Sequence, residues 1–244
     1  DGLVLSAETA VGAYPIECIN MMKRLMAQAQ TVSGGHKPSS HGGFDSLGLV
    51  LPHGGRLIDC WNDRPPAEID QLHKIALSDE ALVDLEQIAN GAFSPLNGFM
   101  NEADFRSVVD RMRLVSGVVW PIPVVLDVSD EIAKDVNIGD RLLLCEGSGV
   151  AAGILHIEDV YRIDKEVTAT KLFQSDDGDH PGVQRVMNMG PVLLGGRVEL
   201  WRRPTSEGNA YELTPRQTRR LFEDRGWNRI AGFENGNVMY CEDE

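Results

Sequence analysis

The chain has 244 residues, and its 42% apolar content is enough for a packed core in one large domain or two smaller ones. Asp and Glu number 37 against 23 Lys and Arg, and the formal net charge of -14 disfavours binding to nucleic acid and other polyanions. Because no apolar stretch is long enough to span a membrane and the N-terminus lacks an export signal, we expect a cytoplasmic protein without a membrane partner.

The first 30 residues predict one strand followed by one helix. Leu3–Leu5 is the strand, and after a polar turn the helix begins at Pro15 and runs to about Gln30. Residues 31–46 come next and are rich in Gly, Ser and Pro, with two histidines. This composition is typical of a flexible linker.

From residue 47 the pattern changes to short strands, turns and brief helices. The predicted helices are Pro66–Leu77, Asp79–Gly91, capped by Ser78, and Glu102–Met112, capped by Asn101. The predicted strands are Ile122–Val128, Arg141–Cys145, Ala151–Ile157 and Val192–Leu200. This mixture indicates a small, partly closed β-barrel decorated with helices.

A last unit begins at Thr214. Thr214 as N-cap, Pro215 at the first helical position and Gln217 form the pattern of a capping box, and Gly226 ends the helix. A strand over Asn228–Phe233 follows. The order of helix, strand and turn is typical of the opening of an α/β domain.

The histidines and cysteines do not predict a metal or cofactor site. His53 and His180 sit beside Gly or Pro in turn-like contexts, where we expect structural hydrogen bonds. The cysteines are widely spaced, without a C-x-x-C pair and without a histidine at ligand spacing, so the sequence indicates neither zinc nor a disulfide framework: Cys18, Cys60, Cys145 and Cys241.

The opening DGLVLSAETAVGAYPIECI resembles the last β/α unit of the pyruvate kinase barrel. The strand, the turn Ser6–Ala10 and the Tyr-Pro helix start all match. Only about an eighth of the chain is covered, and a TIM barrel needs eight such units to close. The resemblance therefore implies a pyruvate kinase-like remnant over residues 1–30, left from a fusion, without that enzyme's activity.

A second resemblance covers nearly everything after residue 46. LVLPHGGRLID, DLEQIANGAFSPLNGFM, WPIPVVLDV, HPGVQRVMNMGPVLLGGRVEL and LTPRQTRRLFEDRGWNRIAGF are similar, in order and spacing, to the amino-terminal half of the ATP sulfurylase (sulfate adenylyltransferase) family. It implies an α+β protein. Residues 47–204 would be a PUA-like β-barrel domain, and residues 205–244 the truncated start of a Rossmann-like nucleotidyltransferase domain.

The same resemblance marks a degenerate catalytic motif. In active members the strand is followed by Gln-Thr-Arg-Asn, two variable residues and His-Arg-x-His. The Gln, Thr, Arg, Asn and two His positions fall in order on Glu234, Asn235, Gly236, Asn237, Tyr240 and Asp243. Family members hold sulfate and triphosphate with these groups, and only the Asn is kept. The resemblance thus implies a catalytic site that has lost its cation and its imidazoles.

Three functions are weighed. The first is a catalytically inactive module of sulfate activation, acting as a structural or interaction domain that docks on a complete ATP sulfurylase subunit or forms a homo-oligomer. The second is a fragment of a bifunctional pyruvate kinase/sulfate adenylyltransferase, which when complete makes adenosine 5'-phosphosulfate and pyrophosphate from ATP and sulfate. The third, RNA binding, is disfavoured by the net charge. Family membership alone leaves enzyme status open, and we expect no cofactor or metal.

Overall fold

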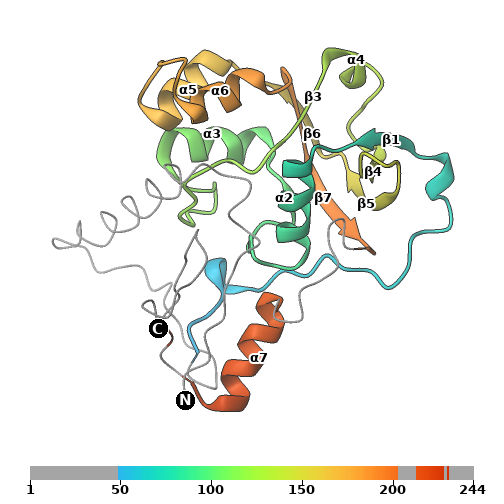
Figure 1. Ribbon diagram of the computed structural model, residues 1–244, viewed down its shortest axis with the longest axis vertical. Helices are drawn as coiled ribbons and strands as arrows, with labels where there is room; N and C mark the ends of the chain where they lie inside the picture. Colours follow the sequence, from blue (N-terminus) through green and yellow to red (C-terminus); the bar gives the residue numbers. More distant parts are fainter. Residues whose placement is uncertain (1–48, 203–212, 228–229, 231–244) are drawn as a thin grey trace, which may run out of the picture.

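The computed structural model describes residues 49–202, 213–227 and 230 (Figure 1). The helical elements are η1 (His53–Gly55), η2 (Ile69–Gln71), α2 (Asp79–Ala89), α3 (Glu102–Arg111), α4 (Asp130–Ala133), α5 (Lys165–Phe173), α6 (Pro181–Asn188) and α7 (Pro215–Arg225). The strands are β1 (His73–Ala76), β2 (Gly98–Phe99), β3 (Leu126–Val128), β4 (Arg141–Cys145), β5 (Ala151–His156), β6 (Asp159–Arg162) and β7 (Val192–Leu200).

All strands in the described part of the chain belong to one seven-stranded sheet that curls around its longest strand, β7. The first residues of β7 pair antiparallel with both β3 and β6, and its last residues pair antiparallel with β5. Strand β2 also pairs with β7, while β4 joins β5 and β1 adds in parallel to β4. A single strand with four partners bends the sheet. In place of the small, partly closed β-barrel that the sequence predicts, the structure thus has a curled sheet accompanied by helices.

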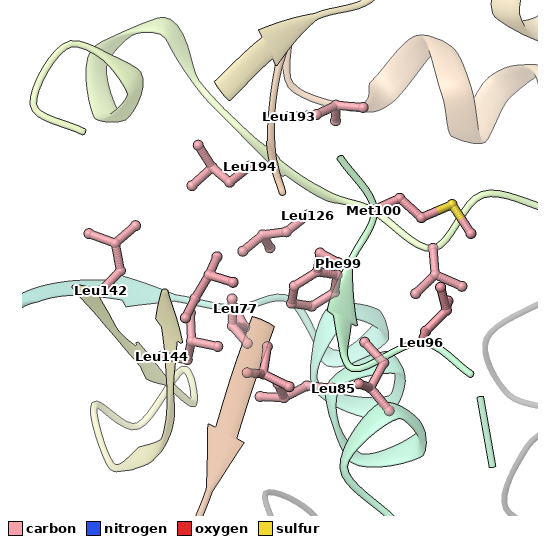
Figure 2. Packing of buried hydrophobic residues seen from close by; sticks show 14 of the residues in the cluster. Leu77, Leu85, Leu96, Phe99, Met100, Leu126, Leu142, Leu144, Leu193 and Leu194 are labelled. Carbon is pink, nitrogen blue, oxygen red and sulfur yellow. The ribbon is translucent and has the colours of Figure 1, made fainter. Parts of the chain in front are cut away.

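The inner face of the curled sheet holds the main core, which helix α2 closes (Figure 2). Its largest fully buried side chains are leucines and isoleucines from α2, β4, β5 and β7: Leu85, Ile88, Leu142, Leu144, Leu155, Leu193, Leu194 and Leu200. Each such side chain contributes about 1.5–3 kcal/mol of burial free energy. The sheet and α2 are therefore a rigid support for the polar groups on the outer face.

Helices α5 and α6 form a separate small layer beside α3 (Figure 1). They share their own apolar cluster of Ala169, Val183 and Val186. Helix α7 lies at the opposite end of the molecule. No helix in the described part of the chain is long and apolar enough to cross a membrane.

Three predicted helix starts are confirmed in atomic detail. The Ser78 side chain accepts a hydrogen bond from the Ala81 amide, and the Asn101 side chain accepts one from the Asp104 amide. Thr214 and Gln217 form the predicted capping box. Helix α7 also ends as predicted, with Gly226 in the left-handed conformation.

The helix predicted over Pro66–Leu77 is wrong. The segment contains only the short η2 and then the strand β1, whose residues pair in parallel with β4. The partner strand supplies the backbone hydrogen bonds. Ile75 and Leu77, two positions apart, both point into the core, with 3% and 6% of their surface exposed. Tertiary pairing has overridden a pattern that helix and strand share.

The predicted strands β4 and β7 match the structure residue for residue, and β5 ends one position early. The strand predicted over Ile122–Val128 is shorter than expected, because only Leu126–Val128 pairs with β7 and the residues before it include Pro123. Besides the short η1, five elements were not predicted: β2, α4, β6, α5 and α6. The strand predicted over Asn228–Phe233 lies outside the described residues apart from Ile230, so a Rossmann-like domain stays a prediction.

Candidate functional site

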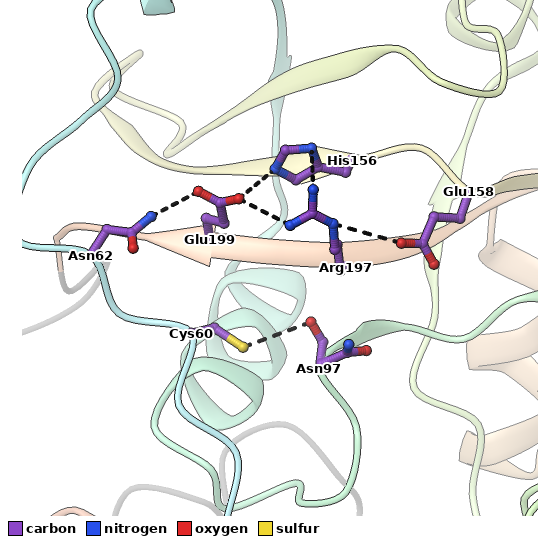
Figure 3. Close-up of polar contacts among 7 residues, drawn as sticks. All are labelled: Cys60, Asn62, Asn97, His156, Glu158, Arg197 and Glu199. Atoms are coloured by element: carbon purple, nitrogen blue, oxygen red, sulfur yellow. Dashed lines mark hydrogen bonds and ion pairs between the residues drawn. The ribbon is translucent and has the colours of Figure 1, made fainter.

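A polar pocket of about 540 Å³ opens on the outer side of β7, lined by Arg56–Asn62, Asn97 and Arg197–Glu199. Beside it lies a group of interacting side chains that we call the polar cluster (Figure 3). Its members are Asn62, His156, Glu158, Arg197 and Glu199. The cluster joins residues as far as 137 positions apart in the chain.

Strand geometry places these side chains together. Arg197 and Glu199 lie on the same face of β7 because side chains alternate along a strand, and Val198 between them points into the core. His156 ends β5, the antiparallel neighbour of β7. Asn62 is brought in by its main-chain amide, which donates to the carbonyl of the last β7 residue at 2.6 Å.

Glu199 is the centre of the cluster (Figure 3). Its Oε1 atom lies 2.8 Å from His156 Nε2 and 3.3 Å from Arg197 Nη1, and its Oε2 accepts from Asn62 Nδ2 at 2.8 Å. Arg197 Nη2 lies 3.4 Å from His156 Nδ1, and Arg197 Nε lies 3.9 Å from a Glu158 oxygen. Because a guanidinium can only donate, these contacts assign the acceptor role to Nδ1 and the proton to Nε2.

The charges in the cluster are already paired. The Arg197 guanidinium is shared between the Glu199 and Glu158 carboxylates, and His156 contacts both Glu199 and Arg197. A site for sulfate or triphosphate needs cations and donors aimed at the ligand. The polar cluster instead has one guanidinium against two carboxylates, so its geometry suits a structural network.

Cys60 borders the same pocket but is not a nucleophile at neutral pH. Its thiol Sγ lies 3.7 Å from the Asn97 carbonyl oxygen. Burial, followed by the charges of Asp59 and Glu199, raises the pKa of the Cys60 thiol to about 11. Because the thiolate is the form that attacks electrophiles and binds metals, Cys60 stays inert at pH 7. Among the residues that the structure describes, no group of three His, Cys, Asp or Glu side chains could hold a metal ion.

A second cleft, of about 530 Å³, lies between α2, α5, α6 and the segment before β3. Its lining is mixed. The Arg185 guanidinium lies 2.9 Å from a Glu80 carboxylate oxygen, and Asp84 and Thr168 are buried. Asp84 and Arg185 both make further interactions.

Helix α7 is seated against the segments at residues 50–59. Arg216 Nη2 donates to Asp59 Oδ2 at 2.8 Å, and Arg219 Nη1 donates to the Val50 carbonyl at 2.9 Å. A groove of about 380 Å³ between α7 and the domain is lined by Pro52, His53, Leu57, Gly91, Ala92, Ser94, Leu213, Pro215, Thr218 and Arg219. Helix α7 is thus attached to residues 50–59 through two of its arginines.

A family model described as a PUA-like domain matches residues 50–203, which is more than half of the chain. The chain belongs to the PUA-like domain family. The matched range contains every strand of the curled sheet, and it leaves α7 outside.

Proteins similar to most of this chain carry the names of sulfate adenylyltransferases. A sulfate adenylyltransferase of Symbiobacterium thermophilum is 38% identical over 196 residues, covering 78% of this chain and 50% of that protein. A probable bifunctional SAT/APS kinase 2 of Sorangium cellulosum is 38% identical over 199 residues, covering 79% of this chain and 34% of that protein. The chain therefore spans half or less of the length of these two relatives, and the similar segment covers most of its own length.

A solved structure supports the same relationship. The structure titled hexameric APS kinase from Thiobacillus denitrificans is similar with a TM-score of 0.54 and 28% sequence identity. The similarity covers 73% of this chain and 32% of that one. The matched fold is accordingly part of a larger protein in that structure.

The degenerate motif positions, Glu234 to Asp243, lie outside the described residues, as do the pyruvate kinase-like segment and the linker. Their assignments stay predictions. Sequence reasoning missed the polar cluster completely. The alternation of Arg197 and Glu199 in a strand could have indicated two charges on one face, but nothing in the sequence pairs them with Asn62 or His156.

Proposed function

We propose that this chain is a protein of sulfate activation in which the PUA-like domain is a non-catalytic platform, and that the chain by itself does not make adenosine 5'-phosphosulfate. The observation that carries the proposal is the seat of α7: the helix that follows the PUA-like domain is attached to it by Arg216 and Arg219. In this proposal the platform holds the start of a nucleotidyltransferase segment in place.

The chemistry of the reaction supports the inactive assignment. Sulfate and triphosphate are both anions, and joining them requires positive charge and donors arranged around the transition state. The guanidinium of the polar cluster is paired with carboxylates, and Cys60 is a neutral thiol. The polar cluster and Cys60 therefore have little to offer such a transition state.

The degenerate motif points the same way. Gly236 stands where the resemblance implies an Arg, and Tyr240 and Asp243 stand where it implies histidines. Loss of one donor aimed at transition-state charge costs about 100 to 1000-fold in rate. Several such losses together, with an added acid at Asp243, account for a chain without measurable turnover.

The proposal also covers domain limits, location and partners. We assign residues 47–204 to the PUA-like domain and residues 205–244 to the start of the nucleotidyltransferase domain, in the cytoplasm where ATP is available. The similarity to a protein titled as hexameric suggests assembly, either with a second copy of this chain or with a complete ATP sulfurylase subunit.

The deciding experiment incubates the purified chain with MgATP and radioactive sulfate, and separates adenosine 5'-phosphosulfate by ion exchange. The Symbiobacterium thermophilum sulfate adenylyltransferase is the positive control, and a variant carrying E234Q, N235T, G236R, Y240H, C241R and D243H tests whether the motif alone limits activity. We expect no product from the natural chain. Sulfate-dependent product in proportion to the amount of chain would overturn the proposal.

The platform role is measured separately by light scattering after size-exclusion chromatography. The chain is run alone and with the same sulfate adenylyltransferase. We expect either a defined homo-oligomer or a complex of fixed stoichiometry. A chain that stays monomeric under both conditions contradicts the assembly part of the proposal.

A further inference from the structure

The carboxylate of Asp59 connects α7 to the PUA-like domain. One of its oxygens, Oδ1, accepts a hydrogen bond from the Trp61 amide at 3.1 Å. The other, Oδ2, accepts from Arg216 Nη2 of α7 at 2.8 Å. Both oxygens of the Asp59 carboxylate thus accept hydrogen bonds. The position of residues 59–62 therefore sets the orientation of this carboxylate toward Arg216.

Residues 60–62 are fixed to β7 by the main chain. The Leu200 amide donates to the Cys60 carbonyl at 2.9 Å, and the Asn62 amide donates back to the Leu200 carbonyl at 2.6 Å. Trp61 forms a parallel bridge with Leu200. On the other side, the Cys60 amide donates to the Ala89 carbonyl at the end of α2 at 3.0 Å.

The polar cluster adds a side-chain attachment at the end of this segment. The Asn62 side chain donates to Glu199 Oε2, while Glu199 Oε1 is held by His156 and Arg197 (Figure 3). The Glu199 carboxylate therefore cannot rotate away without losing several contacts. A fixed acceptor on β7 holds Asn62, and Asn62 is three positions from Asp59.

We propose that the polar cluster is the support of a docking surface for α7, in which Glu199 and Asn62 are positioning residues that hold the Asp59 carboxylate in line with Arg216. The docking surface consists of the Asp59 carboxylate and the Val50 carbonyl. Its partner is the basic helix α7, in which Arg216 and Arg219 lie three positions apart and therefore on the same side of the helix.

The contacts between α7 and the PUA-like domain are exposed and therefore weak, so a fixed Asp59 carboxylate strengthens them. No residue of α7 is fully buried, and the Arg216 and Asp59 side chains are 66% and 43% exposed. Exposed ion pairs lose much of their attraction to solvent and to the entropy of two flexible side chains. A carboxylate already held in position reduces that entropy loss, so docking of α7 depends on the state of the polar cluster.

This inference rests on the proposed function in one respect: the proposed function gives the reason for docking α7, which is to hold the segment that follows it. The docking itself requires no catalytic activity. It is tested by hydrogen exchange and mass spectrometry on the whole chain, which reports α7 and the sheet in the same experiment. A failed activity assay and a failed docking test are therefore separate results.

The variants are R216Q, E199Q, their combination and the matched control R220Q, which changes an exposed arginine of the same helix. R216Q and E199Q should each raise exchange in residues 213–227 by about two- to fivefold, the range expected for loss of an exposed ion pair. The double variant should exchange little faster than the faster single variant, because both changes break one connection. R220Q should leave α7 exchange unchanged.

A second route to the same contact guards against misfolding of E199Q. Asn62→Ala removes the side-chain contact to Glu199 from an exposed position and leaves β7 untouched. It should accelerate exchange in α7 while β4 and β7 keep their protection. The proposal is overturned if E199Q and N62A leave α7 exchange at the natural rate with the sheet intact, or if the effects of E199Q and R216Q multiply.

Discussion

At the scale of single residues, two glycines allow three strands to meet next to the polar cluster. A Cβ atom on Gly98 of β2 would lie 1.8 Å from the Gly196 carbonyl oxygen of β7. A Cβ atom on Gly196 would lie 1.9 Å from the His156 carbonyl oxygen of β5. These distances are far inside van der Waals contact, so the crossing requires residues without side chains.

The substitution G98A should therefore be strongly destabilising. The added methyl group meets backbone rather than a flexible side chain, and overpacking of this kind costs about 1–3 kcal/mol or more. Urea unfolding followed by tryptophan fluorescence measures the loss. The matched control is G147A, at a glycine with open space around its Cβ position, which should change the free energy of unfolding by less than about 0.5 kcal/mol. Equal midpoints for both variants would refute the crowding argument.

Two histidines show how local context can be read correctly. His180 precedes Pro181, and its Nδ1 accepts from the amides of Gly182 at 3.1 Å and Val183 at 3.4 Å, which caps α6. His53 Nε2 lies 2.8 Å from the Val119 carbonyl oxygen. The predicted structural roles of both are confirmed. The cap partners lie within three residues, whereas Val119 could be found only in the fold.

At the scale of elements, helix starts were predicted well because capping is a contact within one turn. Asn101 is the clearest case: its side chain accepts from the Asp104 amide at 2.9 Å, and α3 then brings Phe105 and Val108 into the core. The cap, the acidic first turn and the buried face all point to the same helix. Such agreement between local signals is what makes a short element predictable.

The cap of α3 can be tested by substitution. N101A should lower the free energy of unfolding by about 1 kcal/mol, since the Asp104 amide loses its acceptor. N101S keeps a capping oxygen and should stay close to the natural chain. Both are measured by urea unfolding with a common m value. If N101S destabilises as much as N101A, the contribution of Asn101 is not its cap.

Strand β1 shows the limit of reasoning about single elements. In Pro66–Leu77 the apolar residues Ile69, Leu72 and Ile75 are spaced by three, which is compatible with a helix. In the fold Ile69 and Leu72 pack against a small apolar cluster on the outer face of the sheet, whereas Ile75 lies in the main core. The small cluster consists of Leu143, Cys145 and Ile154. The two clusters lie on opposite faces of the sheet. Pairing with β4 determines which of these side chains faces which cluster.

At the scale of the whole molecule, acidic side chains surround the basic ones. Arg106, Arg141, Arg162, Lys171 and Arg202 each form an ion pair with a Glu or an Asp. With a net charge of -14, these pairings disfavour a continuous basic surface on the described part of the chain. The long-range field of the protein repels polyanions.

The chain should accordingly fail to bind RNA. Filter binding with a labelled 30-nucleotide RNA at about 20 mM salt is the most permissive condition, because electrostatic attraction weakens as salt increases. We expect no retention above background at micromolar protein, with a basic RNA-binding protein as positive control. Retention that decreases steeply with salt would restore nucleic acid as a ligand and contradict the charge argument.

The sequence by itself determined the features that depend on neighbours along the chain: the helix caps, the apolar runs of β4 and β7, and the ordered motifs that resemble sulfate adenylyltransferases. These signals involve only a few residues at a time, so they survive without a fold. The degenerate motif at Glu234 to Asp243 stays a prediction of this kind.

Only the tertiary structure decided what β7 brings together. The polar cluster joins Asn62 and Glu199, which are 137 positions apart, and Asp59 receives Arg216 across 157 positions. The identity of either partner says little, because an exposed Asn or Arg has many possible neighbours. The first pairing is a property of the curled sheet, which packs its apolar face inward and places Glu199 on its outer face, and the second depends on how α7 packs against the loop that carries Asp59.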